Sequence, residues 1–183
     1  CYALLTTHGS KMIKTFHAQH TGLGHSDLGL ICGQAQISDQ ISIENTLNKA
    51  LSTVKLTQNI QEKQWLKLAI NCVINPITAI NNIDNGQLLE DKYQPLIAKL
   101  VNEIVAVANQ QTIALTTEQL STQVFTVATK TAKNCSSMRS DILHKRQTEI
   151  DAINGYIVNI AQSANIAVPE NDKLVRQVKA LAL

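Results

Sequence analysis

Apolar residues are spaced differently in the two parts of this chain. Up to about residue 57 the apolar runs are short and favour strands. From residue 58 onward apolar residues recur every three or four positions, which is the period of helices that bury one face. Strands are predicted at 1–7 and 53–56, with less regular apolar stretches at 14–20 and 22–32. A helix is predicted over 39–51, with Ser42 as a possible N-cap.

The second part of the chain is predicted to be helical throughout. Its helices are expected at 61–75, 93–110, 116–130, 136–145, 148–164 and from 169 to the C-terminus. Pro76 should end or bend the first of them, because it has no N–H to donate to the carbonyl of Cys72, and residues 77–81 could continue that helix. Caps are predicted for later helix ends at Thr116 with Gln119, at Thr148 with Asp151, and at Asn165.

Composition indicates one compact domain, or one domain joined to part of a second. The chain has 183 residues, of which 44% are hydrophobic but only 3% aromatic, so the core must be aliphatic. The helix over 93–110 illustrates this, since its predicted buried face consists of Leu96, Leu100, Ile104 and Val107. The first residue is Cys1 and an apolar run follows at once, so we expect the chain to be a fragment.

Charge and cysteine usage exclude several classes of protein. The net charge is +2 and the basic residues are scattered, which argues against nucleic-acid binding. No apolar stretch reaches the roughly 18 residues of a membrane span. The cysteines Cys1, Cys32, Cys72 and Cys135 are far apart, without C-x-x-C spacing. They are expected to be reduced thiols of a cytoplasmic protein, and no metal site is predicted.

The most informative segment is the apolar helix over 65–80. Lys67, Asn71 and Asn75 interrupt it at intervals of four, which places them on one face. If that face is buried, its polar groups need partners, and a cavity that binds a polar ligand would supply them. The alternative is a solvated face. Against it, the stripe is narrow and is flanked by leucine, isoleucine and valine.

Three further features have a functional and a structural interpretation. Asn85-Gly86 predicts a turn whose amide could face a cleft, or a turn that simply needs a left-handed residue. Glu149 is expected in the first turn of a helix, where the helix dipole favours a carboxylate. It could bind a ligand or only cap the helix. Gly22-x-Gly24 lacks the third glycine of a dinucleotide fingerprint, since Asp27 stands there, and is predicted to be a loop between strands.

Several motifs in order resemble the ketopantoate reductase family. They are Trp65, Lys67 and Asn71, then Ile-Asn-Pro-Ile-Thr-Ala at 74–79, Asn-Gly at 85–86, Ser-Ser-Met-x-x-Asp-Ile at 136–142, Thr-Glu-Ile-Asp-x-Ile-Asn-Gly at 148–155 and Pro-Glu-Asn at 169–171. The resemblance covers nearly the whole chain. It implies a mainly α fold: a helical domain over 58–183, of the 6-phosphogluconate dehydrogenase C-terminal type. Residues 1–57 would be the last strands of an NADP-binding Rossmann-type α/β domain.

The resemblance also implies an activity and a set of roles. The activity is the NADPH-dependent reduction of 2-dehydropantoate to pantoate in pantothenate and coenzyme A biosynthesis. Lys67 is expected to be the general acid, helped by the lower pKa that burial gives a lysine. The implied substrate contacts are Lys67, Asn71, Asn75, Asn85 and Ser137, and the implied NADP(H) contacts are Ser10 and Glu149. Asp141 is expected to be structural or to support Lys67 indirectly.

Other functions remain open at this stage. The glycine-rich phosphate loop of the family is absent from the chain, which by itself is expected to be inactive. A related reductase of another 2-keto acid would use the same residues. A non-catalytic helical dimerisation module would instead leave the stripe of Lys67, Asn71 and Asn75 exposed to solvent. The sequence is compatible with a monomer or a homodimer, and with either NADPH or NADH.

Overall fold

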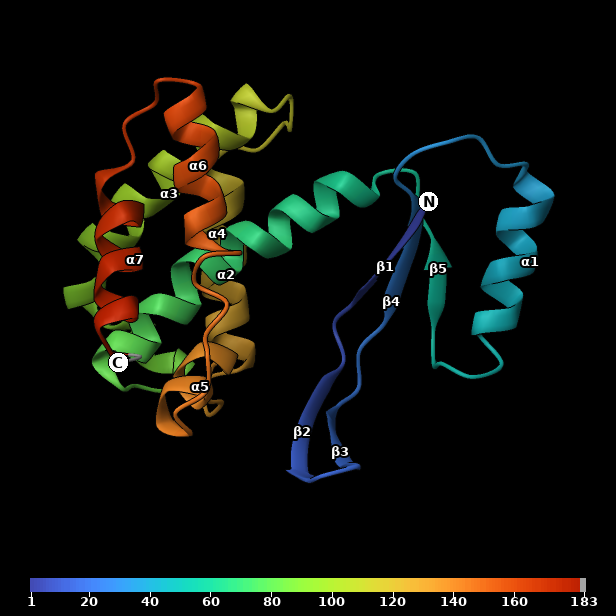
Figure 1. Ribbon diagram of the computed structural model, residues 1–183, viewed down its shortest axis with the longest axis horizontal. Helices are drawn as coiled ribbons and strands as arrows, with labels where there is room; N and C mark the ends of the chain where they lie inside the picture. The colour runs from blue at the N-terminus through green and yellow to red at the C-terminus, as the bar shows by residue number, and fades with distance from the viewer. Residues whose placement is uncertain (182–183) are drawn as a thin grey trace. The chain divides into compact units, whose positions relative to one another are not determined.

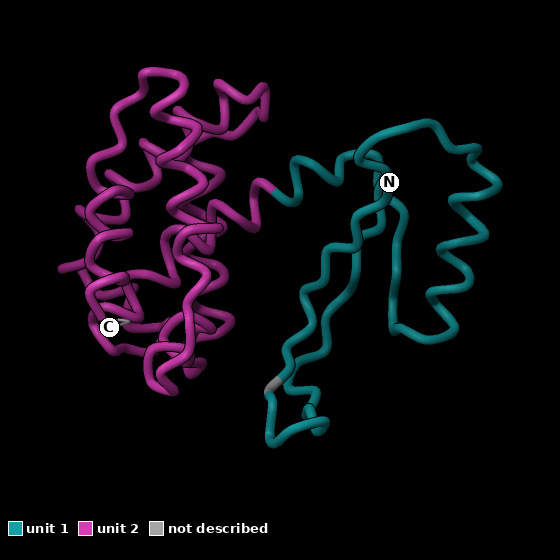
Figure 2. Tube along the Cα trace, in the orientation of Figure 1, with its two compact units in different colours: residues 1–64 teal, residues 65–183 magenta. Residues whose placement is uncertain are grey.

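The computed structural model describes residues 1–181 and divides into two compact units. Unit 1 is Cys1–Gln64 and unit 2 is Trp65–Leu183 (Figure 2). The first holds the strands, one whole helix and the first turn of a second helix, and the second is built from helices (Figure 1). Within residues 1–181, no helix is both long enough and apolar enough to cross a membrane.

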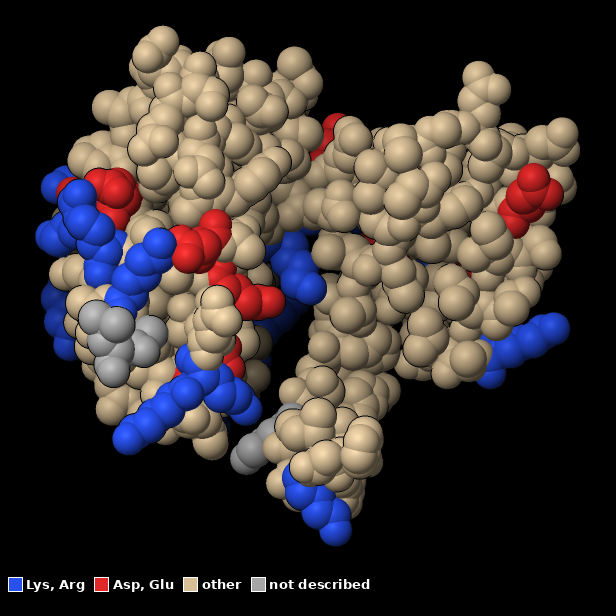
Figure 3. Space-filling model, in the orientation of Figure 1, with Lys and Arg blue, Asp and Glu red and all other residues tan. Residues whose placement is uncertain are grey.

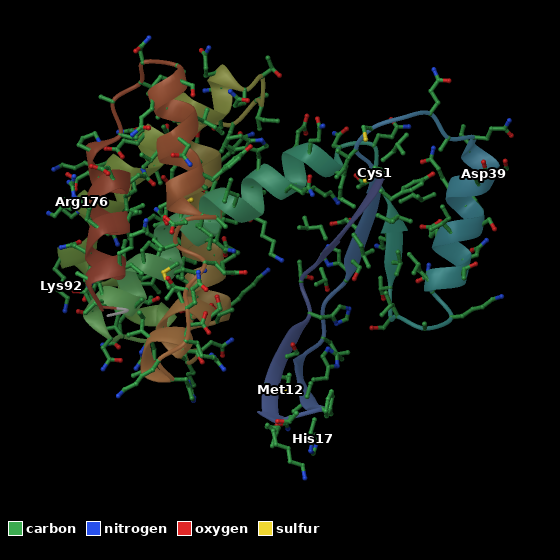
Figure 4. All side chains as sticks on the ribbon, viewed as in Figure 1. Cys1, Met12, His17, Asp39, Lys92 and Arg176 are labelled. Atoms are coloured by element: carbon green, nitrogen blue, oxygen red, sulfur yellow. The ribbon has the colours of Figure 1, made fainter. Side chains whose placement is uncertain are left out.

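Unit 1 contains a three-stranded sheet and a separate hairpin. The sheet has the order β1-β4-β5, from β1 (Tyr2–Thr6), β4 (Ser26–Leu30) and β5 (Val54–Leu56). β1 is antiparallel to β4, whereas β4 and β5 are parallel and joined through α1 (Ile37–Leu47). Parallel neighbours need such a crossover, so this is a strand–helix–strand unit of an α/β fold. The hairpin pairs β2 (Gly9–Lys14) with β3 (His17–Gly22), and Met12 and His17 lie on it (Figure 4).

Close packing on a glycine joins β4 to the start of α2 (Ile60–Asn81). A Cβ at Gly29 would lie 2.3 Å from Cβ of Ile60, whose side chain is 1% exposed.

The predicted strands at 1–7 and 53–56 are confirmed as β1 and β5. Gly24 lies in a loop between β3 and β4, as predicted, whereas Gly22 is the last residue of β3. Ser42 as N-cap was wrong, because α1 begins earlier and Gln36, in an extended conformation, precedes it.

Unit 2 is a set of helices around one apolar core. After α2 come α3 (Gln94–Gln110), α4 (Thr117–Lys130), α5 (Ser137–Leu143), α6 (Asn154–Ser163) and α7 (Pro169–Leu181), with 3₁₀ turns η1 (Asn85–Leu89) and η2 (Asp91–Tyr93) between α2 and α3. The core is aliphatic as expected. Side chains that are 0% exposed include Val73 and Ile77 of α2, Leu100 and Ile104 of α3, and Leu120 and Val124 of α4.

Two predicted helix ends are confirmed in detail. At the start of α4, Gln119 N–H donates to Thr116 Oγ1 at 3.1 Å, and Thr116 N–H donates to Gln119 Oε1 at 3.0 Å. This is the reciprocal capping box. After α6, Asn165 has a φ of 54°. The next N–H, of Ile166, donates to the carbonyl of Ala161 at 2.9 Å. That bond closes the helix end in the usual left-handed way.

One further helix end decides between two alternatives, and another differs from prediction. α2 continues through Pro76 as far as Asn81, so the proline does not end the helix and residues 77–81 continue it. α6 begins at Asn154 rather than near 148, because Ile153 lies outside the helical region with φ −105° and ψ −93°. Thr148 and Asp151 therefore do not cap it. Gly155, expected in mid-helix, lies in the first turn of α6.

Candidate functional site

The polar face of α2 becomes more buried from its first residue to its last. Lys67 is exposed, Asn71 is half-buried and Asn75 is only 6% exposed. The expectation of a buried lysine is therefore wrong within this unit. A wholly solvated face is equally wrong, because Asn75 is packed inside the unit. The face runs from solvent into the interior.

Asn75 meets the start of α5. Its Nδ2 donates to Ser137 Oγ at 3.4 Å, and Ser137 is exposed. The structure thus brings together two of the predicted substrate contacts from distant parts of the sequence. Both are polar and lie at the border between the interior and solvent. Together they offer an amide and a hydroxyl, a pair suited to hydrogen-bonding a polar ligand.

A buried pair of hydroxyls fixes α5 to α2 beside that contact. Thr78 O–H donates to the carbonyl of Ile74 at 2.8 Å. The hydroxyl oxygens of Thr78 and Ser136 are 2.7 Å apart, and either hydroxyl can donate to the other. Ser136 Oγ also accepts the N–H of Arg139 at 3.2 Å and so caps α5. Because Ser136 is 5% exposed and Thr78 0% exposed, this link is protected from water.

Asn85, the first residue of η1, is buried against the end of α4. Its Nδ2 donates to Thr131 Oγ1 at 2.9 Å, and its N–H donates to the carbonyl of Asn134 at 3.1 Å. Its Oδ1 is buried and has no partner among the described residues. No hydrogen bond joins it to Asn75 or Ser137 within residues 1–181. The left-handed residue of this turn is Asn82, with φ 50°, rather than Asn85 or Gly86.

Of the remaining predicted residues, Ser10 and Glu149 lie apart from this cluster along the chain, whereas Asp141 lies one turn after Ser137 on α5. Ser10 is exposed on β2 of unit 1. Glu149 is exposed in the turn before α6, so its expected place in a first helical turn is wrong. Asp141 pairs with Arg146, whose Nε lies 3.0 Å from its Oδ1, which agrees with the structural interpretation.

One buried polar group was missed by the sequence-based prediction. Asn154 is 0% exposed, and its Nδ2 donates to the carbonyl of Cys72 at 2.9 Å. In a regular helix that carbonyl would accept the N–H of residue 76, which Pro76 lacks. Burial also raises the pKa of the Cys72 thiol well above its ordinary value, which keeps it protonated and unreactive.

Charges on the surface of the protein are mixed. Figure 3 shows lysine and arginine side chains interspersed with aspartate and glutamate on the face of unit 2 that it presents. Some form ion pairs, such as Arg176 with Asp172 on α7, where Nη1 and Oδ2 are 2.6 Å apart. Such exposed pairs add little stability. The distribution agrees with the scattered basic residues of the sequence.

Comparison with known proteins identifies the family. Residues 59–182 match the family described as ketopantoate reductase PanE/ApbA C terminal. A 2-dehydropantoate 2-reductase of Vibrio cholerae serotype O1 is 38% identical over 176 residues, covering 96% of this chain and 59% of that protein. The chain therefore belongs to the ketopantoate reductase family, and it spans a little over half the length of this curated relative.

Solved structures show the same fold. A probable 2-dehydropantoate 2-reductase from Bacillus subtilis is 28% identical with a TM-score of 0.80, over 98% of this chain and 60% of that one. A D-mandelate dehydrogenase in complex with NADH has a TM-score of 0.91 at 22% identity, over 99% of this chain and 62% of that one. The helical fold expected from the sequence is confirmed.

Proposed function

We propose that this chain carries the substrate-binding part of an NADPH-dependent reductase that converts 2-dehydropantoate to pantoate, a step of pantothenate biosynthesis. The observation that carries the proposal is the polar face of α2, where Asn75 meets Ser137 at 3.4 Å. Membership of the ketopantoate reductase family supports it. So does the name of the Vibrio relative, a 2-dehydropantoate 2-reductase.

The residues of this face have chemistry that suits a 2-keto acid. Lys67 is exposed, so its Nζ can reach a bound ligand and donate a proton to the former ketone oxygen. Its ammonium would also stabilise negative charge that develops on that oxygen. Asn71 and Asn75, one and two turns further along α2, would hold the substrate by hydrogen bonds, together with Ser137. We place Asn85 near the same ligand, because its buried Oδ1 lacks a partner among the described residues.

The nicotinamide cofactor fits this chain only in part. Bound to the protein, it would supply the hydride for the ketone carbon. The described residues contain no glycine-rich turn between a strand and a helix: Gly22 is the last residue of the strand β3, and Gly24 lies between β3 and β4. Binding of the cofactor phosphates is therefore not assigned to this chain. Ser10 and Glu149 are proposed as contacts to the rest of the cofactor, and the D-mandelate dehydrogenase crystallised with NADH supports a nicotinamide cofactor in this fold.

The proposal is tested by following NADPH oxidation by the full-length protein with 2-dehydropantoate, pyruvate and 2-oxoisovalerate. Turnover confined to 2-dehydropantoate is the expected result. If another keto acid is turned over efficiently, the proposed roles of the α2 residues stand but 2-dehydropantoate is not the substrate. Absence of turnover with all three, in folded protein that binds NADPH, would reject the proposal. It would favour a non-catalytic helical module, although the burial of Asn75 argues against that alternative.

A further inference from the structure

A proline inside α2 leaves one backbone carbonyl without its normal partner. In a regular helix the carbonyl of Cys72 would accept the N–H of residue 76, but that residue is Pro76. Cys72 is 0% exposed, so water does not replace the missing donor. Asn154, at the first position of α6, supplies it instead: its Nδ2 lies 2.9 Å from the Cys72 carbonyl oxygen.

Asn154 is itself held by a chain of hydrogen bonds that leads across the unit. The same Nδ2 donates to Asn171 Oδ1 at 2.9 Å, and Asn171 Nδ2 donates to Glu103 Oε2 at 2.7 Å. The Glu103 carboxylate also accepts the N–H groups of Glu170 and Asn171 at the start of α7, at 2.9 Å and 3.0 Å. Both hydrogens of the Asn154 amide are thus used. The network ties α2, α6, α7 and α3 together.

The anchored carbonyl lies between the two amide residues of the polar face. Cys72 directly follows Asn71, and Pro76 directly follows Asn75. A hydrogen bond to the Cys72 carbonyl therefore fixes the backbone of α2 within the single turn that carries both asparagines. A proline in this turn would otherwise loosen it, because it removes a helical hydrogen bond and its ring crowds the same carbonyl.

We propose that Asn154 is a positioning residue of the substrate site: it replaces the backbone donor that Pro76 lacks and so holds Asn71 and Asn75 in place. This inference rests on the proposed function for its effect on the substrate. Asn154 and Asn171 are 0% exposed, so they act through the backbone of α2 and are not substrate contacts themselves. A purely structural asparagine would stabilise the fold without altering the geometry of the α2 face.

The experiment compares Asn154→Leu, Pro76→Ala and the double variant in the full-length protein. Asn154→Leu removes both donated hydrogen bonds at similar size, and Pro76→Ala restores an N–H one turn after Cys72. Three quantities are measured: the melting temperature, the side-chain amide NMR signals of Asn71 and Asn75, and the KM for 2-dehydropantoate and for NADPH. Thr116→Ala is the matched control, because it removes a hydrogen-bonded cap from α4 without touching the network.

Asn154→Leu is expected to lower the melting temperature, and to do so much less in the Pro76→Ala background. The Asn71 and Asn75 signals should shift, and the KM for 2-dehydropantoate should rise about tenfold with the KM for NADPH unchanged. Thr116→Ala should lower the melting temperature only. Unchanged asparagine signals in folded Asn154→Leu, or an equal loss of melting temperature in both backgrounds, would overturn the inference.

Two provisions keep the test decisive. If Asn154→Leu does not fold, Asn171→Ala removes only the next link, and a smaller shift of the same two amide signals is then expected; no shift overturns the inference. If the unaltered protein reduces no keto acid, the proposed function fails. The amide signals and the melting temperatures, which need no turnover, then decide whether Asn154 positions α2.

Discussion

Replacing Gly86 with alanine should destabilise unit 2 strongly for a change of one methyl group. A Cβ at this position would lie 2.7 Å from Cβ and 2.9 Å from Cα of Ala132. Carbon atoms pack at about 3.5–4.0 Å, so η1 and the segment after α4 would have to separate by roughly 1 Å. Two backbone hydrogen bonds join these segments, from Asn85 N–H to Asn134 and from Gly86 N–H to Ala132, both 3.1 Å long. The separation would stretch both.

The expected loss in free energy of unfolding is about 3–5 kcal/mol, from roughly 1 kcal/mol for each of the two hydrogen bonds and 1–3 kcal/mol for overpacking. The assay is urea denaturation followed by far-UV circular dichroism. The change in free energy of unfolding is calculated from the shift in the urea midpoint, with one value for the dependence of that free energy on urea concentration. Gly22→Ala is the control, because the nearest atom to a Cβ there is 3.7 Å away. It should change stability by less than about 0.5 kcal/mol. Equal stability of the two variants would refute the close packing of η1 on the end of α4.

Two further predictions concern reactive groups. A thiol reagent should react quickly with the three exposed cysteines, Cys1, Cys32 and Cys135. Cys72 is buried and its pKa is raised, so it should react only when the protein unfolds. The labelled cysteines are located by peptide mass, and rapid labelling of Cys72 in native protein would contradict its burial. Lys67→Ala should lower kcat of the full-length protein by about 10²–10⁴-fold, because the proton donor is lost. Lys133→Ala, at another exposed lysine, should leave kcat unchanged, and near-native turnover by Lys67→Ala would remove Lys67 from the acid role.

Local signals predicted those helix ends that local interactions determine. Thr116 and Gln119 cap α4 as expected, because the capping box involves only neighbouring residues. The start of α6 was predicted too early, and its first residue has a distant partner that local patterns do not show. Asn154 bonds to the carbonyl of Cys72, which is 82 positions away in the sequence. No pattern around 148–155 could indicate that contact.

The candidate site was likewise predictable only in part. Intervals of four placed Lys67, Asn71 and Asn75 on one face of a helix, and that helix is present as α2. Their unequal burial was not predictable, because it depends on which helices pack against each turn. Pro76 did reveal that the Cys72 carbonyl needs another donor. Its partner could be any buried polar side chain, and only the fold identifies Asn154.

Whether the polar face of α2 binds the substrate is tested most directly by the KM for 2-dehydropantoate after Asn75→Leu in the full-length protein. Asn75 is the residue of the α2 face that the structure places against Ser137. We expect a KM at least about tenfold higher with the KM for NADPH unchanged, since a hydrogen bond to the substrate is lost. Asn102→Ala, at an exposed position of α3, should leave both constants unchanged. An unaltered KM for 2-dehydropantoate in folded Asn75→Leu would contradict the claim that this face binds the substrate.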